Sequence, residues 1–269
     1  MQADKLIRFS IIDYLNALPL TMAFKDGRFQ GRAELIFDYP SQCADNLASA
    51  RAEVGLISSI EYQRIPDLVV APHIAIASKR EVRSVVIVTR KDLRDVKKIV
   101  LDRYSRSSVA LLRILLYRRY NSRPIFLTMT PDVDKMLAEA DAALIIGDAA
   151  LRIPPGDYQV IDLAAEWYAE TRLPFVFAFW AMREGCDQSE VATLLLEAKT
   201  YGIEQYPKRL DDIRQRWPLS EEEILHYFSH NIHYDLEKEE LASLDHFYRY
   251  AFEASLIDKI TPLRFAPSK

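Results

Sequence analysis

The stretch Ala140-Asp141-Ala142-Ala143-Leu144-Ile145-Ile146-Gly147 lines up with an earlier stretch at 52–59, "AEVGLISS". In both, an amphipathic helical pattern ends in a turn that carries an acid, and a short apolar run follows. A short, continuous apolar run bounded by turn signals is typical of a strand buried on both faces, as in a parallel sheet. The repetition predicts two similar α/β units in one chain.

The segments around these two strands alternate in the same order. Before the first lie an apolar run at 6–11, a helical pattern at 16–27, a second apolar run at 33–40 and a helical pattern at 41–52. Before the second lie corresponding segments at 97–102, 105–120, 124–130 and 131–140. Such alternation predicts parallel β/α units. Each unit should present its loops at the carboxyl ends of its strands, where open α/β sheets bind ligands.

Two further apolar segments, 82–90 and 173–183, are rich in β-formers and are expected to be paired crossover strands between the units, or simply two core strands. From Ser189 onward the pattern is helical, with a capping box at Ser220-x-x-Glu223 and an amphipathic tail at 237–257 expected to buttress the first unit. The predicted architecture is an α/β fold with two lobes, a cleft and a two-stranded hinge. Lobe 1 comprises residues 1–88 and 179–269, and lobe 2 comprises the inserted residues 89–178.

Composition excludes several functional classes. Of 269 residues, 49% are hydrophobic and 28% charged, and the formal net charge is −4, which disfavours general binding to nucleic acid or to an anionic membrane. No apolar run approaches a membrane span and the N-terminus lacks a signal-peptide pattern, so we expect a cytoplasmic protein. The two cysteines, Cys43 and Cys186, have no metal-ligand spacing, and common nucleotide-binding and metalloprotease motifs are absent.

Serines crowd the start of the helical pattern at 105–120. Ser105, Ser107 and Ser108 lie at a helix N-terminus, where free N–H groups and the helix dipole favour an anion. One serine is enough for a cap, so three of them beside Arg106 favour a carboxylate site. The alternative for Arg106 is an ion pair with a surface acid.

The two repeated strands end in polar residues that should face each other across the cleft. Ser58, Ser59 and the backbone of Gly147 are candidate donors to a ligand, and Asp148 is a candidate for orienting a donor. The alternative for Asp148 is that it stabilises the start of a helix. The tail histidines have helix-like spacing, but no acid or cysteine completes a metal set.

The turn at 13–20, "DYLNALPL", leaves two interpretations open: Asn16 caps a helix in which Pro19 occupies the first turn, or Asn16 forms the floor of a ligand cleft. Segments that favour the second interpretation run in order along nearly the whole chain, at 14–20, 54–65, 82–90, 101–116, 142–152, 162–183 and 233–251. Together they resemble the menaquinone-pathway chorismate dehydratases of the futalosine route. That family has the two-lobed periplasmic-binding-protein fold of type II.

The resemblance implies that the chain converts chorismate, a dicarboxylate, to 3-[(1-carboxyvinyl)oxy]benzoate and water. The reaction needs held geometry and stabilised charge but no metal or redox cofactor, and the base implied is the substrate's own enolpyruvyl carboxylate. Asn16 is implied as the catalytic residue. The expected substrate-binding residues are Tyr14, Ser58, Ser59, Ser84, Ser105, Arg106, Ser107, Ser108, Gly147 and Asp148. The alternative function is a non-catalytic cytoplasmic protein that binds or senses a small aromatic carboxylate.

This chain also differs from the family pattern. Arg103 and Tyr104 stand where small hydroxyl residues are usual, and Ser58 stands where proline is common. Bulk at Arg103 and Tyr104 is expected to reshape the pocket.

Overall fold

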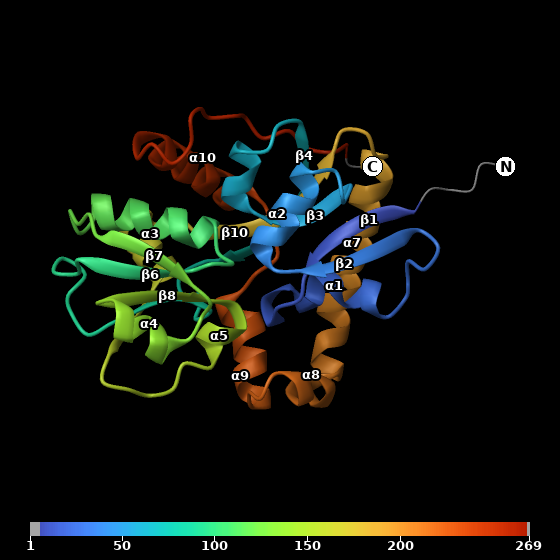
Figure 1. Ribbon diagram of the computed structural model, residues 1–269. Coiled ribbons are helices and arrows are strands. Elements are labelled where there is room, and N and C mark those ends of the chain that lie inside the picture. Colours follow the sequence, from blue (N-terminus) through green and yellow to red (C-terminus); the bar gives the residue numbers. More distant parts are fainter. Residues whose placement is uncertain (1–5, 268–269) are drawn as a thin grey trace.

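The computed structural model describes residues 6–267, which form two five-stranded sheets side by side (Figure 1). The first sheet has the order β2-β1-β3-β10-β4 and the second the order β7-β6-β8-β5-β9. In each sheet the first three strands are parallel and the fourth is antiparallel to the third. The repeat predicted from sequence is therefore confirmed, because β3 and β8, the two repeated strands, take the same place in their sheets.

The first sheet is built mostly from the N-terminal part of the chain. Its elements are β1 (Ile7–Ile12), the 3₁₀ turn η1 (Leu15–Ala17), α1 (Leu18–Lys25), β2 (Ala33–Asp38), α2 (Pro40–Ala48), β3 (Val54–Ser58), the 3₁₀ turn η2 (Ser59–Gln63) and β4 (Leu68–Ser78). The strand β10 (Phe175–Arg183) returns from the second half of the chain and lies between β3 and β4.

The second sheet is built from one continuous segment. Its elements are β5 (Val85–Thr89), β6 (Lys98–Asp102), α3 (Ser107–Arg118), β7 (Ile125–Met129), α4 (Val133–Glu139), β8 (Ala142–Ile146), α5 (Gly147–Leu151), β9 (Gln159–Asp162) and α6 (Leu163–Thr171). We call the parts around the two sheets the first and second lobes.

Of the two interpretations of the crossover segments, the pairing of one with the other is wrong, and they are two separate core strands. β5 pairs with β8 and β9, whereas β10 pairs with β3 and β4, so the two strands lie in different sheets. Each strand hydrogen-bonds to the third parallel strand of its own lobe. The chain changes sheet between Ser78 and Val85 and again before Phe175. The predicted boundaries, 88/89 and 178/179, therefore fall inside β5 and β10.

The C-terminal helices follow β10 and pack partly on the first lobe. They are α7 (Gln188–Gln205), η3 (Tyr206–Lys208), α8 (Leu210–Arg216), α9 (Glu221–His226), the π-helical turn η4 (Tyr227–Asn231) and α10 (Lys238–Glu253). The predicted capping box at Ser220 and Glu223 is present at the start of α9. α7 crosses α1 so closely that a Cβ atom on Gly202 would lie 1.7 Å from the carbonyl oxygen of Pro19.

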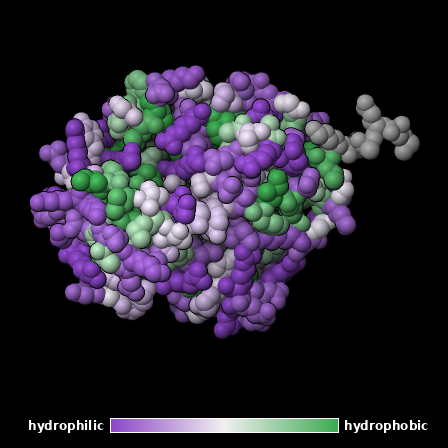
Figure 2. All heavy atoms as spheres, in the orientation of Figure 1, coloured by the Kyte–Doolittle hydropathy of each residue, from purple (hydrophilic) through white to green (hydrophobic). Residues whose placement is uncertain are grey.

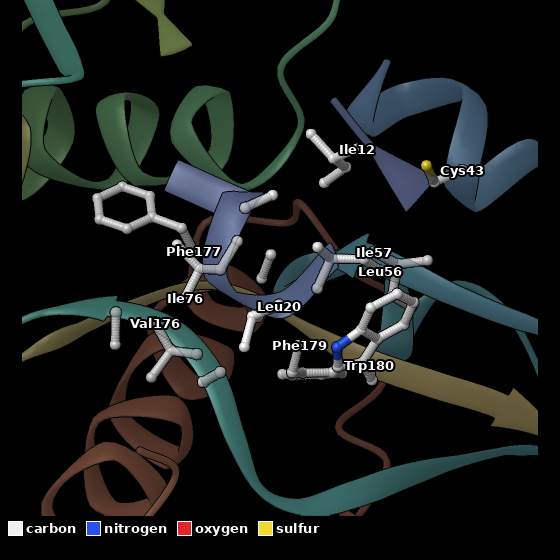
Figure 3. Close-up of a cluster of buried hydrophobic side chains, with 14 of the residues drawn as sticks. Ile12, Leu20, Cys43, Leu56, Ile57, Ile76, Val176, Phe177, Phe179 and Trp180 are labelled. Atoms are coloured by element: carbon white, nitrogen blue, oxygen red, sulfur yellow. The ribbon is translucent and has the colours of Figure 1, made fainter. Parts of the chain in front are cut away.

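Figure 3 shows the apolar core of the first lobe, where side chains from β1, β3, β4, β10 and α1 meet. Trp180 and Phe179 of β10 are fully buried there, as are Leu56 and Ile57 of β3. A strand whose residues are all buried must be apolar on both faces, which explains the unbroken apolar runs in the sequence.

The surface is mainly polar. On the face shown in Figure 2, apolar residues form separate patches within hydrophilic surroundings. Within residues 6–267, no helix combines the length and the apolarity needed to cross a membrane.

Candidate active site

A cavity lies between the two lobes at the carboxyl ends of β1, β3, β6 and β8, and we call it the cleft cavity. It amounts to about 450 Å³ of empty space, part of it open to solvent. Its walls are formed by Ile12, Tyr14, Asn16, Pro40, Ser58, Ile76, Val85, Ser105, Ser107, Ser108, Ile146, Gly147, Phe177 and Ala178. Seven of the eleven residues predicted for the site are among them.

Asn16 lies inside the turn η1 and does not cap a helix. Tyr14 precedes η1 and Ala17 precedes α1, and neither helix start has a side-chain cap. Pro19 occupies the first turn of α1, as predicted. The Asn16 Oδ1 atom is buried and has no hydrogen-bond partner, while its backbone oxygen accepts a hydrogen bond from the Tyr234 hydroxyl at 2.8 Å. A buried polar atom without a partner is costly unless a ligand or water satisfies it.

The start of α3 faces Asn16 from the second lobe. Its first N–H groups have no acceptors within the helix, and no side chain caps them. Ser105, Ser107 and Ser108 line the cavity there, and the Ser105 Oγ atom is buried without a hydrogen-bond partner. The helix dipole and unpaired donors make this wall suitable for a carboxylate.

Tyr14 and Gly147 bring the two lobes into contact at the cavity. Gly147 has a φ of +61°, and a Cβ atom there would lie 2.6 Å from carbon atoms of the Tyr14 ring. Burial raises the pKa of the Tyr14 hydroxyl far above its usual range, and the nearby Asp102 and Asp148 carboxylates raise it further. The residue therefore contributes a neutral phenol to the cavity.

The hydroxyl groups of Ser59 and Ser107 bond to protein groups. The Ser59 hydroxyl donates to the backbone oxygen of Val176 at 2.7 Å and lies 3.0 Å from the Ser107 Oγ atom. Ser107 in turn accepts a hydrogen bond from the backbone N–H of Ile60 at 3.1 Å. Ser59 does not line the cavity, and Ser107, which does, uses its hydroxyl to join the lobes.

The Ser84 hydroxyl and the Gly147 N–H also form hydrogen bonds to protein groups. The Ser84 hydroxyl accepts a hydrogen bond from Tyr227 at 2.7 Å and lies outside the cavity wall. The Gly147 N–H donates to the Ser84 backbone oxygen at 2.7 Å. The expectation that this N–H donates to a ligand is therefore not met, because the residue just before β5 accepts its hydrogen bond.

Arg106 forms ion pairs across the cleft and does not line the cavity. Its guanidinium lies 3.0 Å from Glu61 and 2.7 Å from Asp45, both of the first lobe. The Glu61 carboxylate is nearly fully buried and also pairs with Arg64 at 2.7 Å. Of the two interpretations of Arg106, the structure favours the ion pair.

Asp148 holds the loop that carries Asn16. Its carboxylate accepts hydrogen bonds from the Leu15 N–H at 2.9 Å and the Trp217 indole at 2.7 Å. Burial raises the pKa of Asp148, although these donors oppose the rise. Asp148 does not line the cavity, so it acts on Asn16 through the backbone.

Asp102, at the end of β6, escaped the sequence analysis. It is 1% exposed and accepts hydrogen bonds from the backbone N–H groups of Tyr104 at 2.9 Å and Ile146 at 3.4 Å. Burial raises its pKa to about 6. The sequence feature that could have identified Asp102 as a site residue is its place at the carboxyl end of an apolar strand, directly before the serine-rich turn at 103–108.

Tyr104, whose bulk is expected to reshape the pocket, does not line the cavity. Its ring stacks on that of Tyr39 with 3.8 Å between centroids, which places it outside the cavity wall. Ser58, in contrast, lines the cavity. The bulk of Tyr104 joins the lobes at the rim.

The cavity wall carries no acid and no histidine. Within residues 6–267, no group of three or more histidine, cysteine or acidic side chains is placed to hold a metal ion. The chemical groups that the wall offers are hydroxyls, one amide, one phenol and the N-terminus of α3.

Comparisons of the sequence with known proteins point to one family. Residues 7–253 match the sequence profile of a family described as menaquinone biosynthesis. The chain is 27% identical to a chorismate dehydratase of Thermus thermophilus over 258 residues, which cover 87% of this chain and 91% of that protein. It is 26% identical to a chorismate dehydratase of Campylobacter jejuni over 253 residues, covering 89% and 95% of the two chains.

The fold also matches solved structures. The periplasmic aliphatic sulphonate binding protein of Escherichia coli superposes with a TM-score of 0.63 at 14% identity, covering 98% of this chain and 94% of that chain. The likeness establishes a periplasmic-binding-protein-like fold, as the family resemblance implied.

Proposed function

Because the chain belongs to the menaquinone biosynthesis family, we propose that it is a chorismate dehydratase, which removes water from chorismate to give 3-[(1-carboxyvinyl)oxy]benzoate. One observation of the structure supports the proposal independently of family membership. Two buried, unpartnered oxygen atoms, Asn16 Oδ1 and Ser105 Oγ, line one cavity from opposite lobes.

The dehydration requires the protein mainly to position the substrate and to stabilise the negative charge that develops on it. Loss of the proton from C3 leaves a carbanion that is conjugated, through the adjacent alkene, to the ring carboxylate. The hydroxyl then leaves C4 with the electron pair of the C–O bond, the ring becomes aromatic, and the hydroxide with the released proton makes water. Donors aimed at the ring carboxylate stabilise the charge that develops there.

The start of α3 suits that carboxylate. Ser105 and Ser108 supply hydroxyls beside the free N–H groups of the first turn, and the positive end of the helix dipole favours the anion. Negative charge increases on this carboxylate as C3 loses its proton, so the interaction strengthens during the reaction.

Asn16 is assigned to the reacting hydroxyl. Its Oδ1 atom lacks a donor, and the C4 hydroxyl of chorismate would supply one. Asp148 and Tyr234 hold the backbone on either side of the amide at 2.9 and 2.8 Å, so Asn16 is positioned before the substrate arrives. Because the cavity wall has no acid or histidine, the substrate's enolpyruvyl carboxylate is assigned the role of base.

The test is direct incubation of the purified protein with chorismate. The proposal predicts that 3-[(1-carboxyvinyl)oxy]benzoate accumulates as chorismate disappears, which chromatography with ultraviolet detection resolves. A chorismate-dependent rise in melting temperature with no product would instead identify a binding protein. If there is no product and no change in melting temperature, both functions are refuted.

A further inference from the structure

A second cavity lies away from the cleft, between the C-terminal half of α3, the start of β7 and the end of α10. It comprises about 900 Å³ of empty space, part of it open to solvent. Figure 1 shows α3 and α10 close together on the side of the second lobe. The residues that determine its chemistry are Arg113, Tyr117, Arg123, Phe126, Glu253 and Leu256.

Two guanidinium groups in this cavity have no acidic partner. Arg113 and Arg123 form no ion pair and no side-chain hydrogen bond with any residue within 6–267, and the Arg113 Nε atom is buried without an acceptor. An unsatisfied, buried donor on a charged group is unfavourable. An anionic acceptor close to Arg113 would offset part of that cost.

Neighbouring arginines at the C-terminal end of α3 are, in contrast, paired. Arg118 lies 3.4 Å from Glu170 and 3.3 Å from Glu253, and Arg119 lies 2.8 Å from Glu166. The carboxylates of Glu166, Glu170 and Glu253 therefore form ion pairs with Arg118 or Arg119. The one acid in the cavity wall, Glu253, is among them, so the cavity keeps an excess of positive charge.

Aromatic side chains form the walls beside the two free cations. The Arg113 guanidinium lies 4.6 Å from the centre of the Phe126 ring, and the Arg123 guanidinium lies 5.3 Å from that of Tyr117. A guanidinium held against a ring keeps its planar N–H donors in a fixed orientation, which suits a carboxylate. Leu256 adds an apolar surface.

From these contacts we propose that the cavity is a second ligand site, separate from the cleft, which binds a small aromatic carboxylate of about the size of benzoate. The carboxylate pairs with Arg113 and Arg123, and the ring packs against Tyr117, Phe126 and Leu256. Small-molecule sites commonly combine apolar walls with a few placed polar groups in this way. The proposal does not depend on the reaction in the cleft.

Two-dimensional amide NMR of the full chain, titrated with benzoate, tests it. Backbone signals of Ser122, Ala254 and Leu256 report on this cavity, and those of Ser108 and Gly147 report on the cleft, so binding at the two places is separated. We expect saturable shifts at the first set. The double variant Arg113→Met/Arg123→Gln should raise the Kd derived from them at least tenfold.

A matched control removes another arginine that is stacked on a ring and forms no ion pair with any of the described residues. Arg28 lies 4.6 Å from the ring centre of Tyr201, away from this cavity, and Arg28→Gln should leave the benzoate Kd unchanged. If the double variant does not fold, the exposed Arg123→Gln variant alone should raise the Kd at least threefold. No saturable shift, an unaltered Kd in the arginine variants, or equally tight binding of inorganic phosphate would overturn the assignment.

Discussion

The Ser107 Oγ atom lies 3.0 Å from the Ser59 Oγ atom and accepts a hydrogen bond from the Ile60 N–H at 3.1 Å. Ser107 begins α3 in the second lobe, whereas Ser59 and Ile60 begin η2 in the first. Because the Ser59 proton is donated to Val176, the Ser107 proton is available to Ser59. One buried hydroxyl therefore fastens the two walls of the cleft.

Ser107→Ala should loosen this contact without unfolding either lobe. The Ile60 N–H loses its acceptor, which costs about 1–3 kcal/mol in a buried setting. We expect its hydrogen exchange to speed up roughly tenfold or more, because 1.4 kcal/mol corresponds to a factor of ten. Ser229→Ala, which removes an exposed hydroxyl bonded to the Leu225 backbone oxygen one turn earlier, is the control. Equal Ile60 exchange in wild type and Ser107→Ala would contradict the fastening role.

Asn16→Ala should reduce turnover far more than binding. If the amide positions the reacting hydroxyl for elimination, its loss removes that alignment, and kcat should fall by about 100-fold or more. The Kd for the product should change only a few-fold, because the α3 wall remains. Steady-state kinetics and product titration check the split. A rise in KM with unchanged kcat would remove Asn16 from the chemical step.

Sequence reasoning located the walls of the site but not the partners of every polar group. Ser58 ends a strand of the repeated units, and Asn16, Ser105 and Ser108 lie in segments that follow such strands. The edge of a parallel sheet brings these positions together. Ser59, Arg106 and Asp148 occupy the same edge, yet each bonds to a group from the opposite lobe. Local patterns carry no information on how two lobes face each other, so they cannot separate a ligand group from a fastening group.

The positions of the repeated strands in the fold were predictable from the sequence, but not every strand pairing was. The repeat at 52–59 and 140–147 fixed the place of β3 and β8, because both are buried on two faces and show it as unbroken apolar runs. The partner of β5 was not predictable. An apolar strand such as Val85–Thr89 is equally suited to β8 and to β10, and the choice depends on tertiary packing.

Gly147→Ala should disturb the contact between the two lobes at the cleft cavity and so reduce activity. The variant combines a strained φ of +61° with a Cβ 2.6 Å from the Tyr14 ring. Gly27→Ala is a matched control, since its φ is +74° and nothing lies within 4 Å of the added atom. Both variants should lose about 1–2 kcal/mol of stability from backbone strain. Only Gly147→Ala should lose most of its kcat/KM for chorismate, and equal activities would refute the proposed contact.

Gly202→Ala should destabilise the protein although alanine is the better helix former. The added Cβ would lie 1.7 Å from the Pro19 oxygen, so α7 and α1 must separate. We expect the free energy of unfolding to fall by about 1–3 kcal/mol or more, the usual effect of overpacking. At an unobstructed interior helix site the same change adds about 1 kcal/mol. Gly185→Ala, with nothing within 4 Å, should be close to neutral in the same urea titration.

Asp102 should make stability depend on pH in an unusual direction. Burial raises its pKa from 3.8 to about 6. Below pH 3.8 the carboxyl is protonated in both the folded and unfolded states. Between 3.8 and 6 the unfolded chain releases its proton first, so stability falls as pH rises, and above 6 the full loss of about 3 kcal/mol is reached.

Asp102→Asn removes this titration. In urea unfolding between pH 4 and pH 7, the stability of the wild type relative to Asp102→Asn should therefore fall by up to about 3 kcal/mol as pH rises. Asp141→Asn provides a control of opposite sign, because hydrogen bonding to Lys91 and to backbone N–H groups lowers the pKa of Asp141. Relative to that variant, the wild type should gain stability as pH rises through the range below about 3.8, and its advantage should stay nearly constant between pH 4 and pH 7, where the Asp102 difference falls. A difference between wild type and Asp102→Asn that stays constant with pH would mean that Asp102 ionises as readily in the folded protein as in the unfolded chain.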